Sequence, residues 1–189
     1  MSSYFGTTEG IIDWDSVVEL CINSNTGDRN TPSGVIARSE SEAEGFVLDN
    51  YHEVLGVWVD AGYNLDEIFW HDYYPGHHFD IGVQEKFADL VNADPLRVFV
   101  SEVVPGRNVP YHWDVEDHEA EWLEHGAIER WVCFIDKPRW GSVLILEDTA
   151  FHNIPQHKIY KWDHYKSWHA GTNCGIHSQY LFHFVGRPR

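Results

Sequence analysis

The sequence predicts a mainly β protein with N-terminal helices, in which a helical and loop-rich part (residues 1–95) packs on an antiparallel β-barrel (residues 96–189). Two observations favour this fold class. Apolar residues recur at helical spacing in the first half, whereas the second half contains short β-rich runs at fairly regular spacing. At 189 residues with 43% hydrophobic content, the chain suits one domain (residues 1–189) with a sizeable core.

Three helices are expected in the N-terminal part, over residues 16–23, 41–62 and 84–92. Either Asp13 or Asp15 can cap the first helix, because a carboxylate accepts hydrogen bonds from unpaired N–H groups of the first turn. Gly62 can end the second helix, because glycine tolerates the left-handed conformation common after a last turn. The Asp94-Pro95 pair is expected to end the third, because the residue before proline disfavours the helical conformation.

The second half of the chain contains runs of β-branched and aromatic residues, each bounded by turn or charged residues. These runs predict strands over residues 96–104, 130–136, 141–148, 157–163 and 179–186. Strands of this length and spacing are typical of a β-sandwich or barrel.

The formal net charge of −17 makes nucleic acids and anionic membranes unfavourable partners, because the chain repels phosphate. The first 15 residues have no basic region and no long apolar run, so neither a signal peptide nor a membrane anchor is expected. Three widely spaced cysteines indicate neither a disulfide framework nor a zinc knuckle, and a cytoplasmic location fits them best.

Two H-x-D motifs stand out among the 13 histidines. In a strand, residues i and i+2 share a face, so His112 and Asp114 are expected to point the same way. Mixed nitrogen and oxygen donors suit Fe(II). His78 and Asp80 have the same spacing but run directly into the third predicted helix, where Asp80 is expected to act as a cap.

A facial triad of two histidines and one carboxylate needs a second histidine from a later strand. His169 is a candidate, because the intervening chain has room for about four strands and the following Ala-Gly leaves space around the ring. Other histidines compete for this role: His152, His157, His164, His177 and His183. His183 lies inside an apolar run and can instead be a hydrogen-bonded core histidine.

Four segments together resemble the 2-oxoglutarate and Fe(II)-dependent oxygenases, and within them the aspartyl/asparaginyl β-hydroxylase-like group with its phage and bacterial relatives. They are SEVVPGRNVPYHWD, RWVCFID, KIYKWDHYKSWHAGTNCG and QYLFHFVG. They resemble, in order, the strand and Pro-Gly turn before the proximal histidine, a strand that opens with an arginine, the segment carrying the distal histidine, and the closing strand. The resemblance covers roughly residues 97 to 186.

The resemblance implies a double-stranded β-helix (jelly-roll, cupin-like) barrel and a hydroxylase that uses Fe(II), 2-oxoglutarate as cosubstrate and O2. It implies that Fe(II) binds His112, Asp114 and His169, and that Ser101 and Arg130 help to hold 2-oxoglutarate. A buried guanidinium can pair bidentately with a carboxylate. From the residues alone, Arg130 can equally form a surface salt bridge with Glu129 or Asp136.

Two positions depart from the family pattern. Many members have an arginine about ten residues after the distal histidine to bind the 2-oxoglutarate carboxylate; here that cofactor-binding position is Gln179, which supplies no charge. Val132 stands where the aspartyl hydroxylases tend to have a histidine, whereas Asp114 completes a triad that their animal members lack. The alternative is therefore a cupin-like metal-binding protein or dioxygenase that does not use 2-oxoglutarate, or a barrel that has lost catalysis.

The substrate is not specified by any motif, so a small molecule, an amino acid or a peptide all fit. The segment 114–125 is rich in acidic residues and is expected to lie beside the site, between the second and third barrel strands. It can serve as a lid or recognise a basic substrate; alternatively, it is a solvated acidic loop.

Overall fold

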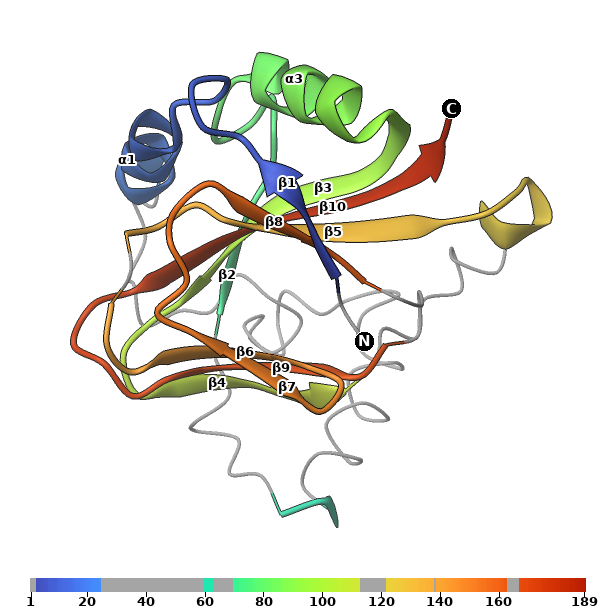
Figure 1. The fold of residues 1–189 in the computed structure, drawn as a ribbon. Coiled ribbons are helices and arrows are strands. Elements are labelled where there is room, and N and C mark those ends of the chain that lie inside the picture. Colours follow the sequence, from blue (N-terminus) through green and yellow to red (C-terminus); the bar gives the residue numbers. More distant parts are fainter. Residues whose placement is uncertain (1–2, 25–59, 63–69, 113–121, 138, 163–166) are drawn as a thin grey trace, which may run out of the picture.

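The computed structural model describes residues 3–24, 60–62, 70–112, 122–137, 139–162 and 167–189, and these include two antiparallel sheets and two helices of 11 residues each (Figure 1). The larger sheet contains, in spatial order, β1 (Ser3–Thr7), β8 (Lys158–Lys161), β5 (Glu129–Phe134), β10 (Gln179–Pro188), β3 (Ala93–Val103) and β2 (His71–Tyr73). The smaller sheet contains β4 (Arg107–His112), β9 (His169–Asn173), β6 (Ser142–Leu146) and β7 (Thr149–His152). The fold is thus mostly β, in the form of a β-sandwich.

Helices α1 (Trp14–Ser24) and α3 (Ile81–Val91) lie over the outer face of the larger sheet, away from the smaller one (Figure 1). Successive side chains of a strand point to opposite faces, so β10 contributes to two cores. Phe182 and Phe184 belong to the core beneath the helices, whereas Leu181 belongs to the core between the sheets. We call these the helix-side core and the inter-sheet core.

The first predicted helix is confirmed as α1, and its cap is Asp13. The Asp13 carboxylate accepts hydrogen bonds from the Ser16 backbone N–H (3.2 Å) and from the Ser16 hydroxyl (2.7 Å). The predicted helix over residues 41–62 lies outside the described residues except for its last three, among which Gly62 has a positive φ of 92°.

The third predicted helix is confirmed as α3, with Asp80 as its cap: the Asp80 carboxylate accepts a hydrogen bond from the Gly82 N–H (2.9 Å). The prediction that Asp94-Pro95 ends this helix is wrong. The helix ends at Asn92, which adopts the left-handed conformation (φ 53°) and donates its N–H to carbonyls of the last turn. Asp94 and Pro95 already belong to β3.

All five predicted strands are present, as β3, β5, β6, β8 and β10. Five others are not among the predicted runs: β1, β2, β4, β7 and β9. These are short or rich in polar and small residues, as in the HAGTN sequence of β9, and a pattern based on apolar content misses such strands. A strand at His112 and a later one carrying the second histidine were nevertheless expected, and β4 and β9 are these strands.

The three cysteines are unpaired, and two of them lie deep in the helix-side core. Burial raises the pKa of both the Cys21 and the Cys133 thiol to about 12, so both are protonated and unreactive near neutral pH. No helix within the described ranges has the length and apolar character needed to cross a bilayer.

Candidate metal centre

Two of the predicted ligands, His112 and His169, lie side by side in the smaller sheet. His112 ends β4, His169 begins β9, and the two residues are direct partners in the antiparallel register. Their ring centroids are 4.3 Å apart. His169 is buried and its ring meets the edge of Trp162, a residue of the inter-sheet core, at 4.5 Å. The pair therefore faces the interior of the sandwich.

Each ring is oriented by a backbone carbonyl two residues earlier in the chain. The Nδ1 atom of His112 lies 2.6 Å from the Pro110 carbonyl oxygen, and the Nδ1 atom of His169 lies 3.0 Å from that of Ser167. A carbonyl oxygen can only accept, so both Nδ1 atoms carry the hydrogen. In the neutral rings the lone pair then resides on Nε2, which is the arrangement by which metal-binding histidines are commonly oriented.

A β-bulge brings the two histidines into register. Val109 pairs with Gly171 while His112 pairs with His169, so β4 contains one more residue than β9 over this stretch. Without the extra residue, Tyr111 would lie opposite His169 and its side chain would point to the other face. Pro110 lies at the bulge in an edge strand, a position that tolerates a residue without an N–H.

Tyr111 and Trp168 stack on the outer face of the smaller sheet, with centroids 5.2 Å apart; we call this pair the aromatic clamp. Glu147, which follows β6, connects it to the sheet. The Tyr111 hydroxyl donates to the Glu147 carbonyl (3.2 Å), and the Glu147 N–H donates to the Trp168 carbonyl (2.7 Å). The clamp thus fixes the strand ends that carry both histidines.

Arg130 points into the sandwich. Its side chain is only 7% exposed, and its guanidinium carbon lies 5.6 Å from the ring centroid of Trp162. The two acids that were its alternative partners bind other cations, because Glu129 pairs with Lys161 (2.6 Å) and Asp136 pairs with Arg139 (3.6 Å). Arg130, Trp162 and His169 therefore form a contiguous interior row.

Ser101 is also buried, and its hydroxyl lies 2.9 Å from Nε2 of His183. The His183 ring stacks on Phe99 at 4.6 Å with an interplanar angle of 8°. His183 is thus a hydrogen-bonded histidine of the sandwich interior, one of the alternatives that the sequence left open.

Gln179 lies far from Arg130. It is the first residue of β10 and pairs with Val103, whereas Arg130 pairs with Val185, about 20 Å further along the same strand. The structure thus does not bring these two residues together. The Gln179 Oε1 atom is buried without a hydrogen-bond partner among the described residues.

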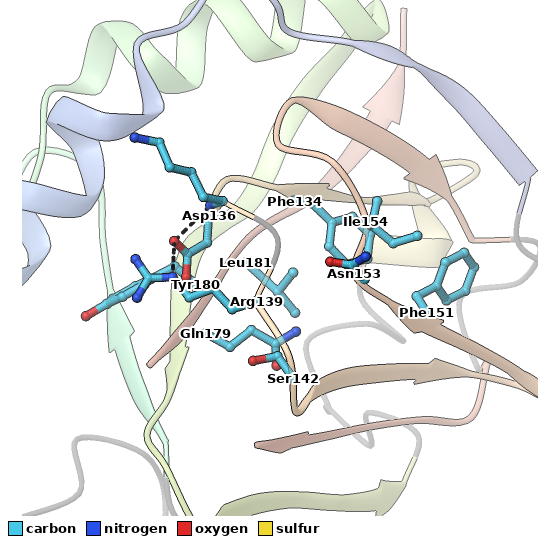
Figure 2. A pocket seen from close by; sticks show the side chains of 11 residues that line it. Phe134, Asp136, Arg139, Ser142, Phe151, Asn153, Ile154, Gln179, Tyr180 and Leu181 are labelled. Carbon is cyan, nitrogen blue, oxygen red and sulfur yellow. Dashed lines mark hydrogen bonds and ion pairs between the residues drawn. The ribbon is translucent and has the colours of Figure 1, made fainter. Parts of the chain in front are cut away.

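Gln179 instead lines a small pocket with an apolar side formed by Phe134, Phe151, Ile154 and Leu181 (Figure 2). Asp136 and Arg139 line its charged side. Burial raises the pKa of the Asp136 carboxyl, although the neighbouring Arg139 opposes the shift.

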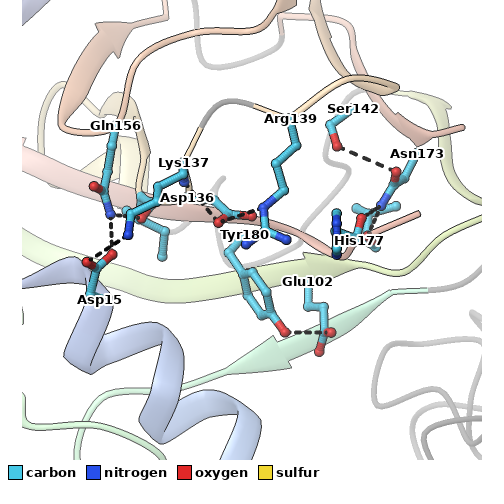
Figure 3. A network of polar contacts seen from close by, with 12 residues as sticks. Asp15, Glu102, Asp136, Lys137, Arg139, Ser142, Gln156, Asn173, His177 and Tyr180 are labelled. Carbon is cyan, nitrogen blue, oxygen red and sulfur yellow. Dashed lines mark hydrogen bonds and ion pairs between the residues drawn. The ribbon is translucent and has the colours of Figure 1, made fainter. Parts of the chain in front are cut away.

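The end of the sandwich that holds Gln179 is closed by a network around Asn173 (Figure 3). The Asn173 amide donates to the carbonyls of Val103 and His177, both at 2.7 Å, and its oxygen accepts from the Gly175 N–H at 3.0 Å. Asn173 is the last residue of β9 and His169 the first, so this closed end lies about 13 Å along the strand from the histidine pair.

Some of the other candidate metal ligands lie outside the residues that the structure describes. Asp114 lies outside the described residues, as do His164 and most of the acidic segment 114–125. Within the described ranges, no group of three or more histidine, cysteine, aspartate or glutamate side chains comes together. The second H-x-D motif has another role there, because His78 accepts a hydrogen bond from the Tyr74 N–H (2.8 Å) and Asp80 caps α3.

Sequence reasoning missed several residues that surround the histidines: Trp162, Ser167, the aromatic clamp and Glu147. One signal was available, because alternate residues of an extended chain share a face. Counting back by two from His169 gives Ser167, and counting back by two from His112 gives Pro110. Trp162 follows β8 of the larger sheet and His169 begins β9 of the smaller one, so their contact carries no such signal.

Comparisons with known proteins give distant similarities. No protein-family model matches the chain, and neither does any curated protein. A viral collagen prolyl hydroxylase from Paramecium Bursaria Chlorella virus-1, solved in complex with 2-oxoglutarate, is 15% identical, with a TM-score of 0.45 over 72% of this chain and 89% of that one. A truncated form of the same hydroxylase is 14% identical, with a TM-score of 0.43 over 72% and 83%.

A protein assigned as a sugar phosphate isomerase, from Acidithiobacillus ferrooxidans, is 15% identical with a TM-score of 0.35. The match covers 53% of this chain, and the chain spans only 55% of that protein's length. Similarities at these identities and TM-scores do not identify an activity.

Proposed function

We propose that the protein is an Fe(II)- and 2-oxoglutarate-dependent oxygenase that hydroxylates a small molecule, an amino acid or a peptide. The observation that carries this proposal is the pairing of His112 and His169, whose rings lie 4.3 Å apart with both Nδ1 hydrogens held by carbonyls. Asp114, two residues after His112, would complete a facial triad of two histidines and one carboxylate. When bound, Fe(II) and 2-oxoglutarate would supply the oxidative chemistry.

The strand order supports a double-stranded β-helix for the residues from β3 to β10. The chain moves repeatedly between the sheets: β3, β5, β8 and β10 lie in the larger sheet, and β4, β6, β7 and β9 lie in the smaller one. Eight strands in two interleaved sheets are the arrangement of a jelly roll, the architecture of the cupins. In such a barrel, strands distant in sequence can contribute ligands to one metal.

The chain's own residues have defined tasks in this proposal. The imidazoles of His112 and His169 would hold the metal through Nε2, and the carbonyls of Pro110 and Ser167 keep the rings in place. Arg130 supplies positive charge inside the sandwich, where a carboxylate is attracted more strongly than in water. Ser101 adds a hydroxyl on the same interior face. Gln179 takes no part, because it lies at the closed end near Asn173.

For the substrate, we propose a basic amino acid or peptide, recognised by the acidic segment 114–125. The chain carries 30 acidic and 13 basic residues, and this segment is one of its densest acidic stretches. The test is to neutralise Glu116, Asp117, Glu119 and Glu121 together. Activity that falls on a basic substrate but persists on a neutral one supports recognition, whereas unchanged activity on both shows that the segment is only solvated.

The metal-binding part of the proposal is tested by anaerobic titration with Fe(II). We expect His112→Ala to lose high-affinity Fe(II) binding. His78→Ala removes the histidine of the second H-x-D motif and should bind Fe(II) as the wild type does. Equal loss in both variants would contradict the assignment of the pair.

The cosubstrate is tested by adding 2-oxoglutarate to the anaerobic Fe(II) protein. We expect the weak visible charge-transfer band of a chelated keto acid, and succinate formation in air with a panel of basic substrates. Bound Fe(II) without the band would favour the cupin-like metal protein that does not use 2-oxoglutarate. No metal binding would favour a barrel that has lost catalysis.

A further inference from the structure

Two hydrogen-bond donors are buried beside His169 without a protein acceptor. The indole Nε1 of Trp162 and the hydroxyl of Ser167 have no hydrogen-bond partner among the residues that the structure describes. The two side chains are only 5% and 3% exposed. Both contact the candidate metal centre, because the Trp162 ring meets His169 at 4.5 Å and the Ser167 carbonyl orients the same imidazole.

Such atoms are uncommon in a folded protein, because a buried donor has given up its hydrogen bonds to water. An indole N–H can only donate, so it cannot be satisfied by any of the neighbouring N–H groups. Ser167 lies two residues before His169, and both residues are buried. Both residues that carry the unpaired donors are therefore in direct contact with the His169 imidazole.

The positive charge of Arg130 determines which kind of hydrogen-bond acceptor can bind beside Trp162. The guanidinium carbon of Arg130 lies 5.6 Å from the Trp162 ring centroid and is buried on the same interior face. A ligand cation would be repelled there. A carboxylate suits the place, because it only accepts hydrogen bonds, has several lone pairs and is attracted by the guanidinium.

We propose that the Trp162 indole N–H and the Ser167 hydroxyl bind a carboxylate group of the ligand that joins the metal, with Arg130 supplying the charge. This inference rests on the proposed function and adds two binding residues to it. It makes Trp162 a binding residue rather than only a wall of the inter-sheet core.

Trp162→Phe is the sharpest variant, because it removes the donor and keeps an aromatic ring against His169. Losing one hydrogen bond to a charged group weakens binding by about ten- to hundredfold. We therefore expect the dissociation constant for 2-oxoglutarate to rise by that factor in the Zn(II)-loaded protein, with Zn(II) affinity unchanged. Ser167→Ala, which leaves its carbonyl in place, provides a second and independent test in the same direction.

The indole N–H signals of the Zn(II)-loaded, 15N-labelled protein give a readout that needs no turnover. The signal of Trp162 is assigned by its loss in Trp162→Phe, and we expect it to move when 2-oxoglutarate is added. Trp131 is the matched control. Its indole Nε1 is likewise buried without a partner among the described residues, but it lies in the helix-side core. Its signal, assigned with Trp131→Phe, should stay in place.

Succinate identifies which carboxylate is bound, because it keeps both carboxylates but lacks the keto group that chelates a metal. A shift of the Trp162 signal with both acids assigns Trp162 to the carboxylate remote from the metal. A shift with 2-oxoglutarate alone assigns it to the keto-acid end. Either result supports the proposal.

The failure of this inference is distinguishable from the failure of the proposed function. If the wild type binds Zn(II) and 2-oxoglutarate, but the Trp162 signal stays in place and both variants bind as tightly as the wild type, only this inference is overturned. If the wild type binds no 2-oxoglutarate, the proposed function and the inference are both wrong. Urea unfolding of each variant shows whether a loss of affinity reflects a loss of fold.

Discussion

The larger sheet separates two cores, and the main clusters of buried polar groups in them differ, although the helix-side core also contains one indole, that of Trp131, without a partner among the described residues. In the helix-side core, the fully buried Glu102 carboxylate accepts hydrogen bonds from the hydroxyls of Tyr73 (2.5 Å) and Tyr180 (2.7 Å), as Figure 3 shows in part. Beside the inter-sheet core, Trp162 and Ser167 have no such partner within the described residues. A buried group paired inside the protein supports the fold, whereas a cluster of unpaired donors around two histidines indicates a surface for a ligand.

Strand β10 illustrates this difference within one run of residues. Phe182 contacts Trp14 and Phe87, with centroids 4.9 and 4.8 Å away, and fixes both helices to the sheet. The next residue, His183, points to the other face and meets Phe99 and the Ser101 hydroxyl. One face of β10 therefore contributes mainly to the stability of the fold, whereas the other faces the sandwich interior that contains the candidate site. Substitutions on each face can test this difference.

The largest effect is expected for Phe182→Ala. The side chain is fully buried, so its loss removes apolar contacts and leaves a cavity that the helices and sheet cannot fill completely. We expect the free energy of unfolding to fall by about 3–5 kcal/mol, measured by urea denaturation. Fe(II) affinity of the folded fraction should remain unchanged. A large loss of affinity would show that the two cores are not independent.

A smaller but still large effect is expected for Glu102→Ala, which leaves two tyrosine hydroxyls in the helix-side core without an acceptor. We expect a loss of about 2–4 kcal/mol in the free energy of unfolding. Burial and the neighbouring Glu102 raise the pKa of Tyr180, so its hydroxyl remains a donor that needs an acceptor. Glu102→Gln keeps one acceptor oxygen and should cost less; equal losses would contradict this account.

For the residues around the histidine pair, we expect Trp168→Ala to lower Fe(II) affinity more than it lowers the free energy of unfolding. Trp168 is 42% exposed, so its removal costs little core packing. It stacks on Tyr111 and holds the strand ends that carry both metal-binding histidines. Substitution of such supporting residues lowers metal affinity by about ten- to hundredfold. Trp140→Ala, at an 82% exposed tryptophan away from the histidines, is the control and should leave Fe(II) binding unchanged.

The features that could be predicted from the sequence are those that depend on neighbouring residues in the chain. The long apolar strands, a cap of α1 at Asp13 or Asp15 and the cap at Asp80 follow from local patterns, because spacing and capping act within a few residues. The pairing of His112 with His169 depends on a bulge at Pro110, and the register of one strand against another is not encoded in either strand alone. Similarly, the contact of Trp162 with His169 and the distance between Gln179 and Arg130 arise only when the sheets assemble.

The smallest expected effect concerns the cap of α1, whose Trp14, Val17 and Cys21 belong to the helix-side core. Hydrogen bonds from the Ser16 side chain and backbone lower the pKa of the Asp13 carboxyl, so the charged form is favoured by folding. The resulting stabilisation is present above the unfolded pKa of about 4 and is lost as the pH falls through the lower pKa of the folded state.

Asp13→Asn isolates this effect, because asparagine also caps a helix but does not titrate. We expect the wild type to lose more of its Tm than Asp13→Asn does when the pH is lowered from 7 to 3, as measured by thermal denaturation of both proteins. Asp15→Asn tests whether this pH dependence is specific to the helix cap. The pKa of Asp15 is also lowered, but by Gln156 and, to a smaller extent, Lys137, which both lie outside the helix. If helix α1 and the larger sheet unfold as one unit, both variants should show a single thermal unfolding transition. A separate transition at lower temperature in Asp13→Asn would show instead that α1 detaches while the inter-sheet core and its histidine pair remain folded.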